Sequence, residues 1–406
     1  MKALQKMEIS ASRRGTFIIA VLLGSLSAIA PLSIDMYLPA LPSLAKALDA
    51  SPSLSQLSLT TCMIGIALGQ LIIGPISDVR GRRMPLLIGL FIYAAASLCC
   101  VFAPNVWLFI ALRFLQGFAG AAGIVISRAS VRDLYSGVEL TKFLALLMLV
   151  NGAAPILAPI IGAEVLVYTS WRGVFAVLCG TGLLLLAAIW FGLKESLPEE
   201  RRSRGGMRNT LLIFRRLLTD SAFMGYALTQ GLIMAAMFAY ISGSSFVVQD
   251  IYGVTPRGFS LIFAMNGAGI IAASQLTGRL AGRFSARGML GAGLCLSSTG
   301  AALLLFAVWA GWGLTFVCIA FFLLVSSVGI VSTTTVSLAL QEQGQSAGSA
   351  SALLGLLSFV FGGIAAPLVG LGGEGTALPL ALVISLFVLA ALVVFFALTG
   401  RKAKNA

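Results

Sequence analysis

Histidine is absent from this 406-residue chain, and charged residues make up only 10% of it. Any proton chemistry must therefore use carboxylates, because no imidazole is present. The six cysteines all fall within apolar runs, so they indicate small buried residues and neither a disulfide framework nor a metal site. A Gly-Lys-Ser/Thr phosphate loop is also missing, which argues against ATP-driven chemistry. We expect no metal and no cofactor.

Apolar residues, by contrast, make up 59% of the chain, and the mean hydropathy is +1.01. No soluble globular domain can hide that much apolar surface. The runs are long and lack the ten-residue alternation of an outer-membrane barrel, and the 45 glycines suit closely packed helices. We predict an all-α membrane protein with twelve transmembrane helices, at residues 17–41, 53–76, 85–103, 107–130, 140–167, 171–193, 221–249, 258–280, 288–308, 311–336, 348–370 and 377–399.

A basic, polar stretch at residues 194–220 separates two sets of six predicted helices. The decapeptides GPISDVRGRR, from Gly74, and GRLAGRFSAR, from Gly278, follow the second and eighth helices and lie about half the chain apart. Such a repeat is typical of transporters in which two halves rock about a central site. We therefore predict two pseudo-symmetric six-helix bundles, residues 1–193 and 221–406, joined by a cytoplasmic linker at 194–220.

The basic residues are distributed unevenly between the two ends of the predicted helices. All but four of the 27 Lys and Arg lie in the terminal segments, in the linker or in loops on that same side. Lys46, Arg172 and Arg257 lie opposite, and Arg113 lies within a helix. By the positive-inside rule both termini are cytoplasmic, which predicts a multi-pass membrane protein. The net charge of +13 is then a topology signal, and no nucleic acid partner is expected.

One carboxylate, Asp35, lies inside the first predicted helix, in the stretch PLSIDMYLPALP at residues 31–42. A charge there costs at least ~2.5 kcal/mol on insertion scales, and helix formation does not require it. Asp35 either reaches water near the helix end or serves an ion-coupled or substrate-coupled site. Arg113, in the fourth helix, is predicted at the same depth, roughly 9 Å inside the same face. Burial and the charge of Arg113 would together set the protonation state of Asp35.

The loop after the second helix contains Gly74, Asp78, Gly81, Arg82 and Arg83 in the pattern G-x3-D-x2-G-R-R. This pattern resembles the signature loop of the major facilitator superfamily. Physically, the glycines permit a tight turn and a close approach of helices. The repeat copy has a glycine in place of the acid, so we expect a loop of this function in the first half only.

The resemblance also assigns a role to Asp133, which follows the fourth predicted helix. In the family an acid at this place pairs with the signature-loop arginine, although ordinary loop charge is the alternative. The resemblance implies that Asp78, Arg82 and Asp133 form a latch. We expect this latch to hold the cytoplasmic face closed in the outward-facing state and to break in each cycle.

Further stretches resemble the drug:proton antiporter branch of this superfamily. The segment RFLQG, from Arg113, is similar to its buried-arginine motif. The segment APIIGA, with Pro159 and Gly162, is similar to its antiporter motif, although alanines replace the usual first and last glycines. SIDMYLPALP and residues 238–253 resemble the Bcr/CflA subfamily, the bicyclomycin- and chloramphenicol-resistance exporters. This branch implies proton coupling through Asp35 and Arg113, and it implies a place in the bacterial inner membrane.

Substrate contacts are harder to predict. Methionines and an aromatic residue share one face of the seventh helix and could form an adaptable wall for lipophilic ligands, or could simply pack. Buried amides need partners, either substrate or another helix. Glu164 lies near a helix end and is expected to reach interfacial water. The cavity candidates are Tyr37, Asn151, Met234, Met237, Tyr240 and Asn266.

These observations predict a monomeric, proton-coupled exporter of small lipophilic drugs that works by alternating access in the lipid bilayer. The alternative is a transporter of the same fold for a metabolite such as an amino acid, a peptide or a sugar. Uptake symporters usually have several polar cavity residues, which are few here. An intramembrane enzyme would need paired acids or a nucleophile with a base at helical spacing, and neither pattern is present.

Overall fold

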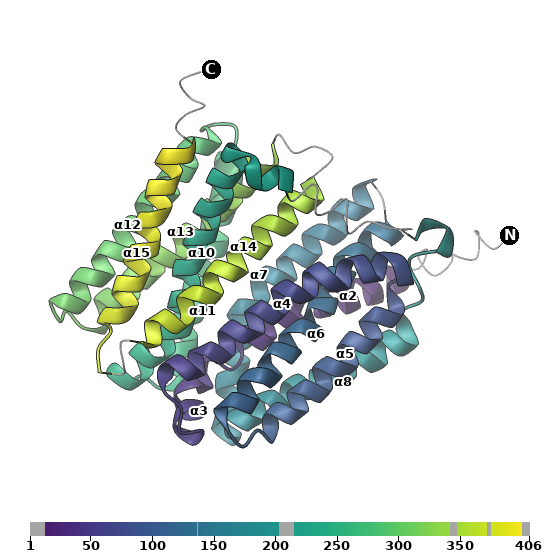
Figure 1. Cartoon of the computed structure of the whole chain (residues 1–406), viewed down its shortest axis with the longest axis horizontal. Helices are drawn as coiled ribbons and strands as arrows, with labels where there is room; N and C mark the ends of the chain where they lie inside the picture. The colour runs from purple at the N-terminus through teal and green to yellow at the C-terminus, as the bar shows by residue number, and fades with distance from the viewer. Residues whose placement is uncertain (1–12, 136, 203–214, 342–346, 372–374, 400–406) are drawn as a thin grey trace.

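Twelve long helices account for most of the computed structural model, which describes residues 13–135, 137–202, 215–341, 347–371 and 375–399 (Figure 1). Their bounds lie within a few residues of the predictions, which confirms the all-α fold. The helices are α2 (Arg13–Asp35), α4 (Pro52–Arg80), α5 (Arg83–Val101), α6 (Val106–Leu134), α7 (Gly137–Tyr168), α8 (Trp171–Gly192), α10 (Ser221–Phe246), α11 (Pro256–Leu280), α12 (Ala286–Trp309), α13 (Leu314–Leu340), α14 (Ala347–Gly370) and α15 (Leu378–Thr399).

Most of these helices are long and apolar enough to cross a membrane. Eleven meet that description in full, and α7 contributes a shorter apolar stretch, Gly152–Tyr168, among its described residues.

The starts of several helices follow local capping signals in the sequence. The side chains of Ser51, Asn105 and Thr255 each accept a hydrogen bond from a backbone N–H in the first turn of the helix that follows, as N-caps do.

The first transmembrane segment is interrupted rather than continuous. Helix α2 ends at Asp35, and the chain continues through a short 3-10 turn, Leu38–Ala40, into α3 (Leu41–Ala47). Pro39 and Pro42 lack backbone N–H donors and each stand at the start of a new helical turn, as proline prefers. The helix predicted at residues 17–41 is therefore interrupted, and α2 ends four residues before Pro39. Asp35 is thus the last residue of α2.

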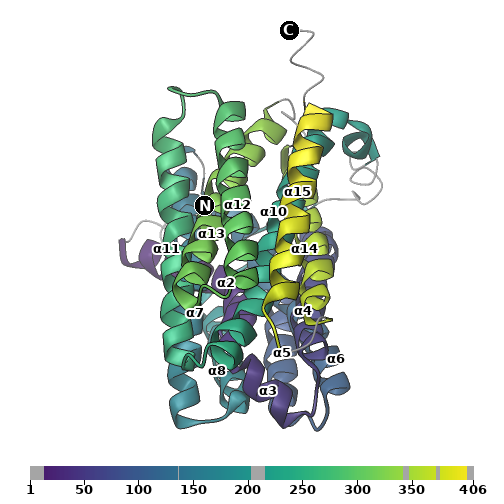
Figure 2. The same ribbon diagram turned by 90° about the vertical axis from the view of Figure 1, so that its left-hand side faces the viewer.

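The helices form two groups that lean apart at one end (Figure 1). Helices α2 to α8 lie together in one group, and α10 to α15 in the other. Figure 2, from the side, shows their long axes running in broadly the same direction. Between the groups, α4 packs against α14 and α7 against α11. This arrangement confirms the two six-helix bundles. The basic linker lies partly outside the described residues, as do both predicted terminal extensions.

We call the end with the start of α2 and the end of α15 the terminal face, and the opposite end, with α3, the distal face (Figure 1). Polar contacts between the bundles gather toward the distal face. Thr60 Oγ1 donates to the carbonyl of Gly363 at 3.0 Å, near the distal halves of α4 and α14. Ser260 Oγ likewise donates to the carbonyl of Pro159 at 2.9 Å. The bundles are therefore joined at the distal face and separate toward the terminal face.

Candidate functional site

A cavity of about 830 Å³ lies between the two bundles, within the range typical of small-molecule sites. Its deep end is formed by Ile34 and Asp35 of α2 together with Asn266 of α11. Its mouth includes Arg132 and Asp133, at the end of α6. Since the end of α6 belongs to the terminal face, the cavity opens on that face and is closed toward the distal one.

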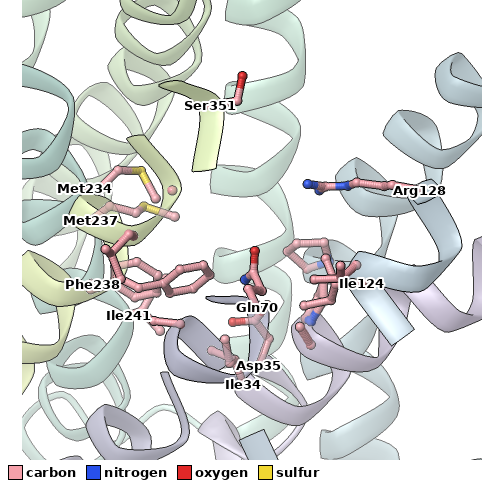
Figure 3. Close-up of a pocket in the computed structure, with 18 of the residues that line it drawn as sticks. Ile34, Asp35, Gln70, Ile124, Arg128, Met234, Met237, Phe238, Ile241 and Ser351 are labelled. Atoms are coloured by element: carbon pink, nitrogen blue, oxygen red, sulfur yellow. The ribbon is translucent and has the colours of Figure 1, made fainter. Parts of the chain in front are cut away.

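Asp35 lines the deep end of this cavity and is only 4% exposed (Figure 3). None of the residues that the structure describes forms a hydrogen bond or an ion pair with its carboxylate. The side chain faces the cavity between the bundles and is almost completely buried there. The interpretation of Asp35 as a residue that simply reaches interfacial water is therefore not supported by its position.

Arg113 lies close to the same segment but does not line the cavity. Its guanidinium donates to the carbonyl of Ser33 at 2.8 Å and to Oε1 of Gln116, and it is completely buried. It also stacks over the rings of Tyr37, at 4.4 Å, and Phe175, at 5.5 Å. Arg113 thus contacts the backbone of Ser33, two residues before Asp35, on the side of α2 that faces away from the cavity. The prediction of a shared depth agrees with this geometry, whereas a direct Asp35–Arg113 pair is absent.

Tyr37 was predicted to line the cavity, and this prediction is wrong. The tyrosine is fully buried under Arg113, and its hydroxyl lies 3.2 Å from Oγ of Ser58. Tyr37 keeps a near-helical backbone conformation, and two helical steps of about 100° each place residue 37 on the side of the segment opposite Asp35. Asn151 lies outside the side chains that the structure describes, so its predicted role stays a prediction.

The second bundle supplies the apolar wall of the cavity. Met234 and Met237 of α10 line it (Figure 3). Tyr240 of α10 and Asn266 of α11 belong to the same lining. Nδ2 of Asn266 donates to the hydroxyl of Tyr240 at 2.8 Å, while its Oδ1 has no hydrogen-bond partner among the residues that the structure describes. The Tyr240 ring stacks on Phe263, with ring centroids 5.6 Å apart. This wall combines adaptable methionine and aromatic surface with a small polar spot at the deep end.

The signature loop forms a network of charges at the cavity mouth. Arg82 donates to Asp78 at 2.5 Å, to Asp133 at 2.9 Å and to the hydroxyl of Ser77 at 2.7 Å. Burial opposes the charged form of Arg82, but the hydrogen bonds to Asp133 and Asp78 outweigh it and raise the pKa of the guanidinium.

The glycines of the loop lie at its turn and beside the cavity. Gly81 ends α4 with φ +89°, a conformation that favours glycine. Gly74 lines the cavity one turn before Asp78.

The three charges Asp78, Arg82 and Asp133 are in contact, as the resemblance implied. They were also expected to separate when the cavity opens toward this face, and that expectation is not met. All three belong to α4, α6 and the short loop between α4 and α5, which pack within one bundle. The network therefore does not span the gap between the bundles. Because it lies within one bundle, a rigid movement of that bundle leaves the distances between the three charges unchanged.

Glu195, after α8, was missed by the sequence analysis. Its carboxylate accepts hydrogen bonds from the backbone N–H groups of Arg82, at 2.8 Å, and Arg83, at 3.1 Å. Partial burial opposes its ionisation, but the N–H donors of Leu197, Arg82 and Arg83 and the charge of Arg202 prevail and lower the pKa of Glu195. The only sequence signal was an acid directly after the sixth helix. Glu195 therefore anchors the signature loop to the end of its own bundle.

The antiporter motif lies where α7 meets two other helices. A side chain at Gly162 would collide with the carbonyl oxygen of Met36, so only glycine allows α7 to lie this close to the chain after α2. The carbonyl of Pro159 accepts the hydrogen bond from Ser260 of α11. This part of α7 is thus packed against the Asp35 segment and against the opposite bundle.

Two ion pairs, not foreseen from the sequence, join the bundles at the distal face. Arg257 donates to both carboxylate oxygens of Glu164, at 2.8 and 2.7 Å. Lys46 lies 3.0 Å from a carboxylate oxygen of Asp250. Glu164 is about half exposed, as expected, but it also has this partner. Residues so distant in sequence offer no local signal for such pairs.

Comparisons with known proteins agree with this architecture. The sequence model of the Major Facilitator Superfamily matches residues 23–367. An uncharacterized MFS-type transporter, YdgK, of Bacillus subtilis (strain 168) is 45% identical over 386 residues, covering 95% of this chain and 96% of that protein. A bicyclomycin resistance protein homolog of Haemophilus influenzae is 33% identical over 393 residues, covering 97% of this chain and 99% of that protein.

A solved structure shares the fold at low identity. The bacterial homolog of the human lysosomal transporter Spinster, in its inward-facing and unoccupied conformation, aligns with a TM-score of 0.75 and 14% identity, covering 96% of this chain and 98% of that one. These matches run nearly the whole length of the chain and confirm the family that the signature loop indicated. The chain belongs to the major facilitator superfamily, and it is a multi-pass membrane transporter of a small molecule rather than an enzyme.

Proposed function

We propose that this transporter exports small lipophilic compounds in exchange for protons. The observation that carries the proposal is Asp35, a lone carboxylate at the deep end of the cavity with no partner among the described residues. A buried carboxylate without a partner can bind and release a proton as its surroundings change. With no histidine in the chain, a carboxylate is the natural proton carrier.

The apolar wall supports a lipophilic substrate. Met234, Met237, Phe238 and Phe263 offer methionine and aromatic surface that can adapt to different ligands. The resemblance to bicyclomycin- and chloramphenicol-resistance exporters, and the similarity to a bicyclomycin resistance protein homolog, favour the same class of compound. A metabolite such as a sugar would call for more polar groups than this wall provides.

The basic residues support an orientation with the terminal face in the cytoplasm. In that orientation the cavity is open inward and the distal ion pairs close the outer side. A compound from the cytoplasm or inner leaflet could enter, displace water around Asp35 and favour proton release. Rocking of the bundles would then open the distal face, and protonation of Asp35 from outside would favour substrate release. One proton carrier in one shared cavity is sufficient for this exchange.

The test is transport by purified protein in proteoliposomes with an imposed pH gradient. Asp35→Asn should insert and purify normally, yet lose pH-driven drug transport and substrate-induced proton release. Glu199→Gln, at a glutamate whose side chain is 84% exposed, is the control and should behave like wild type. Full pH-driven transport by the Asp35→Asn protein would refute the assignment.

A drug-susceptibility panel in an efflux-deficient strain would identify substrates, and unchanged susceptibility to every compound would refute export.

A further inference from the structure

The two walls of the cavity differ in chemistry. The wall from the first bundle carries Asp35, Gln70 and Arg128, whereas the facing wall is mainly methionine, phenylalanine and isoleucine (Figure 3). A ligand that fills the cavity would therefore meet polar groups along one side and apolar surface along the other. Proton coupling accounts for Asp35, but it assigns no role to Arg128.

Arg128 is a cation without a counter-charge. It lies on α6 five residues before Asp133, or roughly 7.5 Å deeper than the loop at the mouth. Figure 3 shows its guanidinium extending into the cavity above Asp35, toward the methionine wall. No hydrogen bond, ion pair or ring contact joins Arg128 to any other residue within the described ranges. The acids nearest the mouth, Asp78 and Asp133, are already paired with Arg82.

A guanidinium in such a place favours an anionic partner. Its planar array of N–H donors matches a carboxylate with two parallel hydrogen bonds, which is stronger and more directional than a contact with water. Gln70 lies on the same wall and is likewise without a hydrogen bond to any described residue, so its amide can add a donor. The dissimilar walls place such a polar group opposite a surface for an apolar ring or chain.

We propose that Arg128 and Gln70 form a binding subsite for the anionic group of an amphipathic substrate, whose apolar body lies against Met234, Met237 and Phe238. The inference rests on the proposed use of this cavity for substrate, and it narrows the substrate class to lipophilic compounds with a carboxylate or similar acceptor group. Asp35 remains the proton carrier at the deep end. The subsite is therefore a specificity determinant separate from coupling.

The experiment measures equilibrium binding, which does not depend on proton coupling. Purified full-length protein is titrated with 2-naphthaleneacetate and with the neutral 2-naphthaleneacetamide, which share one apolar body, and dissociation constants are obtained by calorimetry. Arg128→Gln should weaken binding of the carboxylate about tenfold, as expected for loss of a hydrogen bond to a charged group, and change binding of the amide less than about threefold. Arg128→Lys should restore part of the affinity for the carboxylate.

Arg132→Gln is the matched control, because Arg132 lies one turn nearer the mouth of the same helix and also lines the cavity. It removes the same charge and should affect both ligands by less than about threefold. An equal loss of affinity for the carboxylate in Arg128→Gln and Arg132→Gln would indicate general electrostatic attraction and would overturn the subsite. Equal weakening of carboxylate and amide by Arg128→Gln would overturn it as well. Absence of pH-driven transport with carboxylate-selective binding intact would refute the proposed function but not this subsite.

Discussion

At the scale of single residues, two of the charges buried in the first bundle, Asp35 and Arg113, have different environments. Asp35 faces the cavity with no described partner, whereas Arg113 is enclosed by a carbonyl, an amide and two aromatic rings. Interactions with aromatic faces and backbone acceptors stabilise a buried cation without a counter-ion. Arg113 therefore stabilises the Asp35 segment through Ser33, while the Asp35 carboxylate itself has no such partner among the described residues.

Gly162 allows a direct prediction about packing. Gly162→Ala would place a methyl group against the carbonyl of Met36, and backbone cannot give way as a flexible side chain can. We expect destabilisation of about 1–3 kcal/mol, the usual range for overpacking, seen as a lower thermal midpoint in detergent together with reduced transport. Gly180→Ala is the control, since a methyl group there meets no atom within 4 Å. A Gly162→Ala protein with wild-type stability would show that α7 can move away freely.

At the scale of elements, the signature loop is fastened to its own bundle. Gly81 turns the chain, Arg82 joins α4 to α6, and Glu195 holds the backbone of the next helix start. The loop thereby ties the ends of α4, α5, α6 and α8 together. This explains why its charges can stay paired while the cavity is open on the same face.

Glu195 makes the stability of this loop depend on pH. Its pKa is lowered in the folded protein, so its contribution is present above the ordinary glutamate pKa and is lost as pH falls through the lowered value. Glu195→Gln should therefore lower the thermal midpoint at pH 7 by roughly 2 °C, and the difference from wild type should shrink below about pH 4.5. Thermal scans over pH 3–8 measure this. A difference that is constant over the whole range would contradict the assignment.

At the scale of the whole molecule, the distal ion pairs link one bundle to the other. The pairs Glu164–Arg257 and Lys46–Asp250 lie at the surface and are partly exposed to solvent, so each contributes little to stability. Even a small contribution matters when two conformations are close in free energy, since 1 kcal/mol changes their ratio about fivefold. The pairs should therefore bias the protein toward the conformation that is closed at the distal face.

Neutralising Glu164 and Lys46 together should shift the population toward a distal-open state. Spin labels at Tyr168→Cys and Trp309→Cys, both highly exposed, would report the distance between the bundles in a background without the six native cysteines. We expect a longer distance to gain population by up to about tenfold when both pairs are removed.

The matched control for this measurement is Arg172→Gln. Arg172 donates to the carbonyl of Val101 within its own bundle, so its loss should leave the distance distribution unchanged. The charge-swapped pair Glu164→Arg with Arg257→Glu should restore the distal-closed population. An unchanged distribution after removal of both pairs would mean that the distal face is closed by packing alone.

The sequence by itself determined the number of long helices, most of their bounds and the signature loop. These features depend on local properties: runs of apolar residues, capping side chains, prolines, and charges at fixed spacing. The contacts of Arg82 with Asp78 and Asp133 followed only from the family resemblance.

Only the tertiary structure decided which buried residues face the cavity and which segments meet across the bundles. Arg113 and Tyr37 lie near Asp35 in the fold yet point away from the cavity. Two helical steps carry Tyr37 to the side of the segment opposite Asp35, and the rotation of α6 about its axis directs Arg113 into the bundle. Lys46 and Asp250, or Arg82 and Glu195, meet because separate helices pack together. Such rotations and pairings arise from the packing of all twelve helices, which no local stretch of sequence encodes.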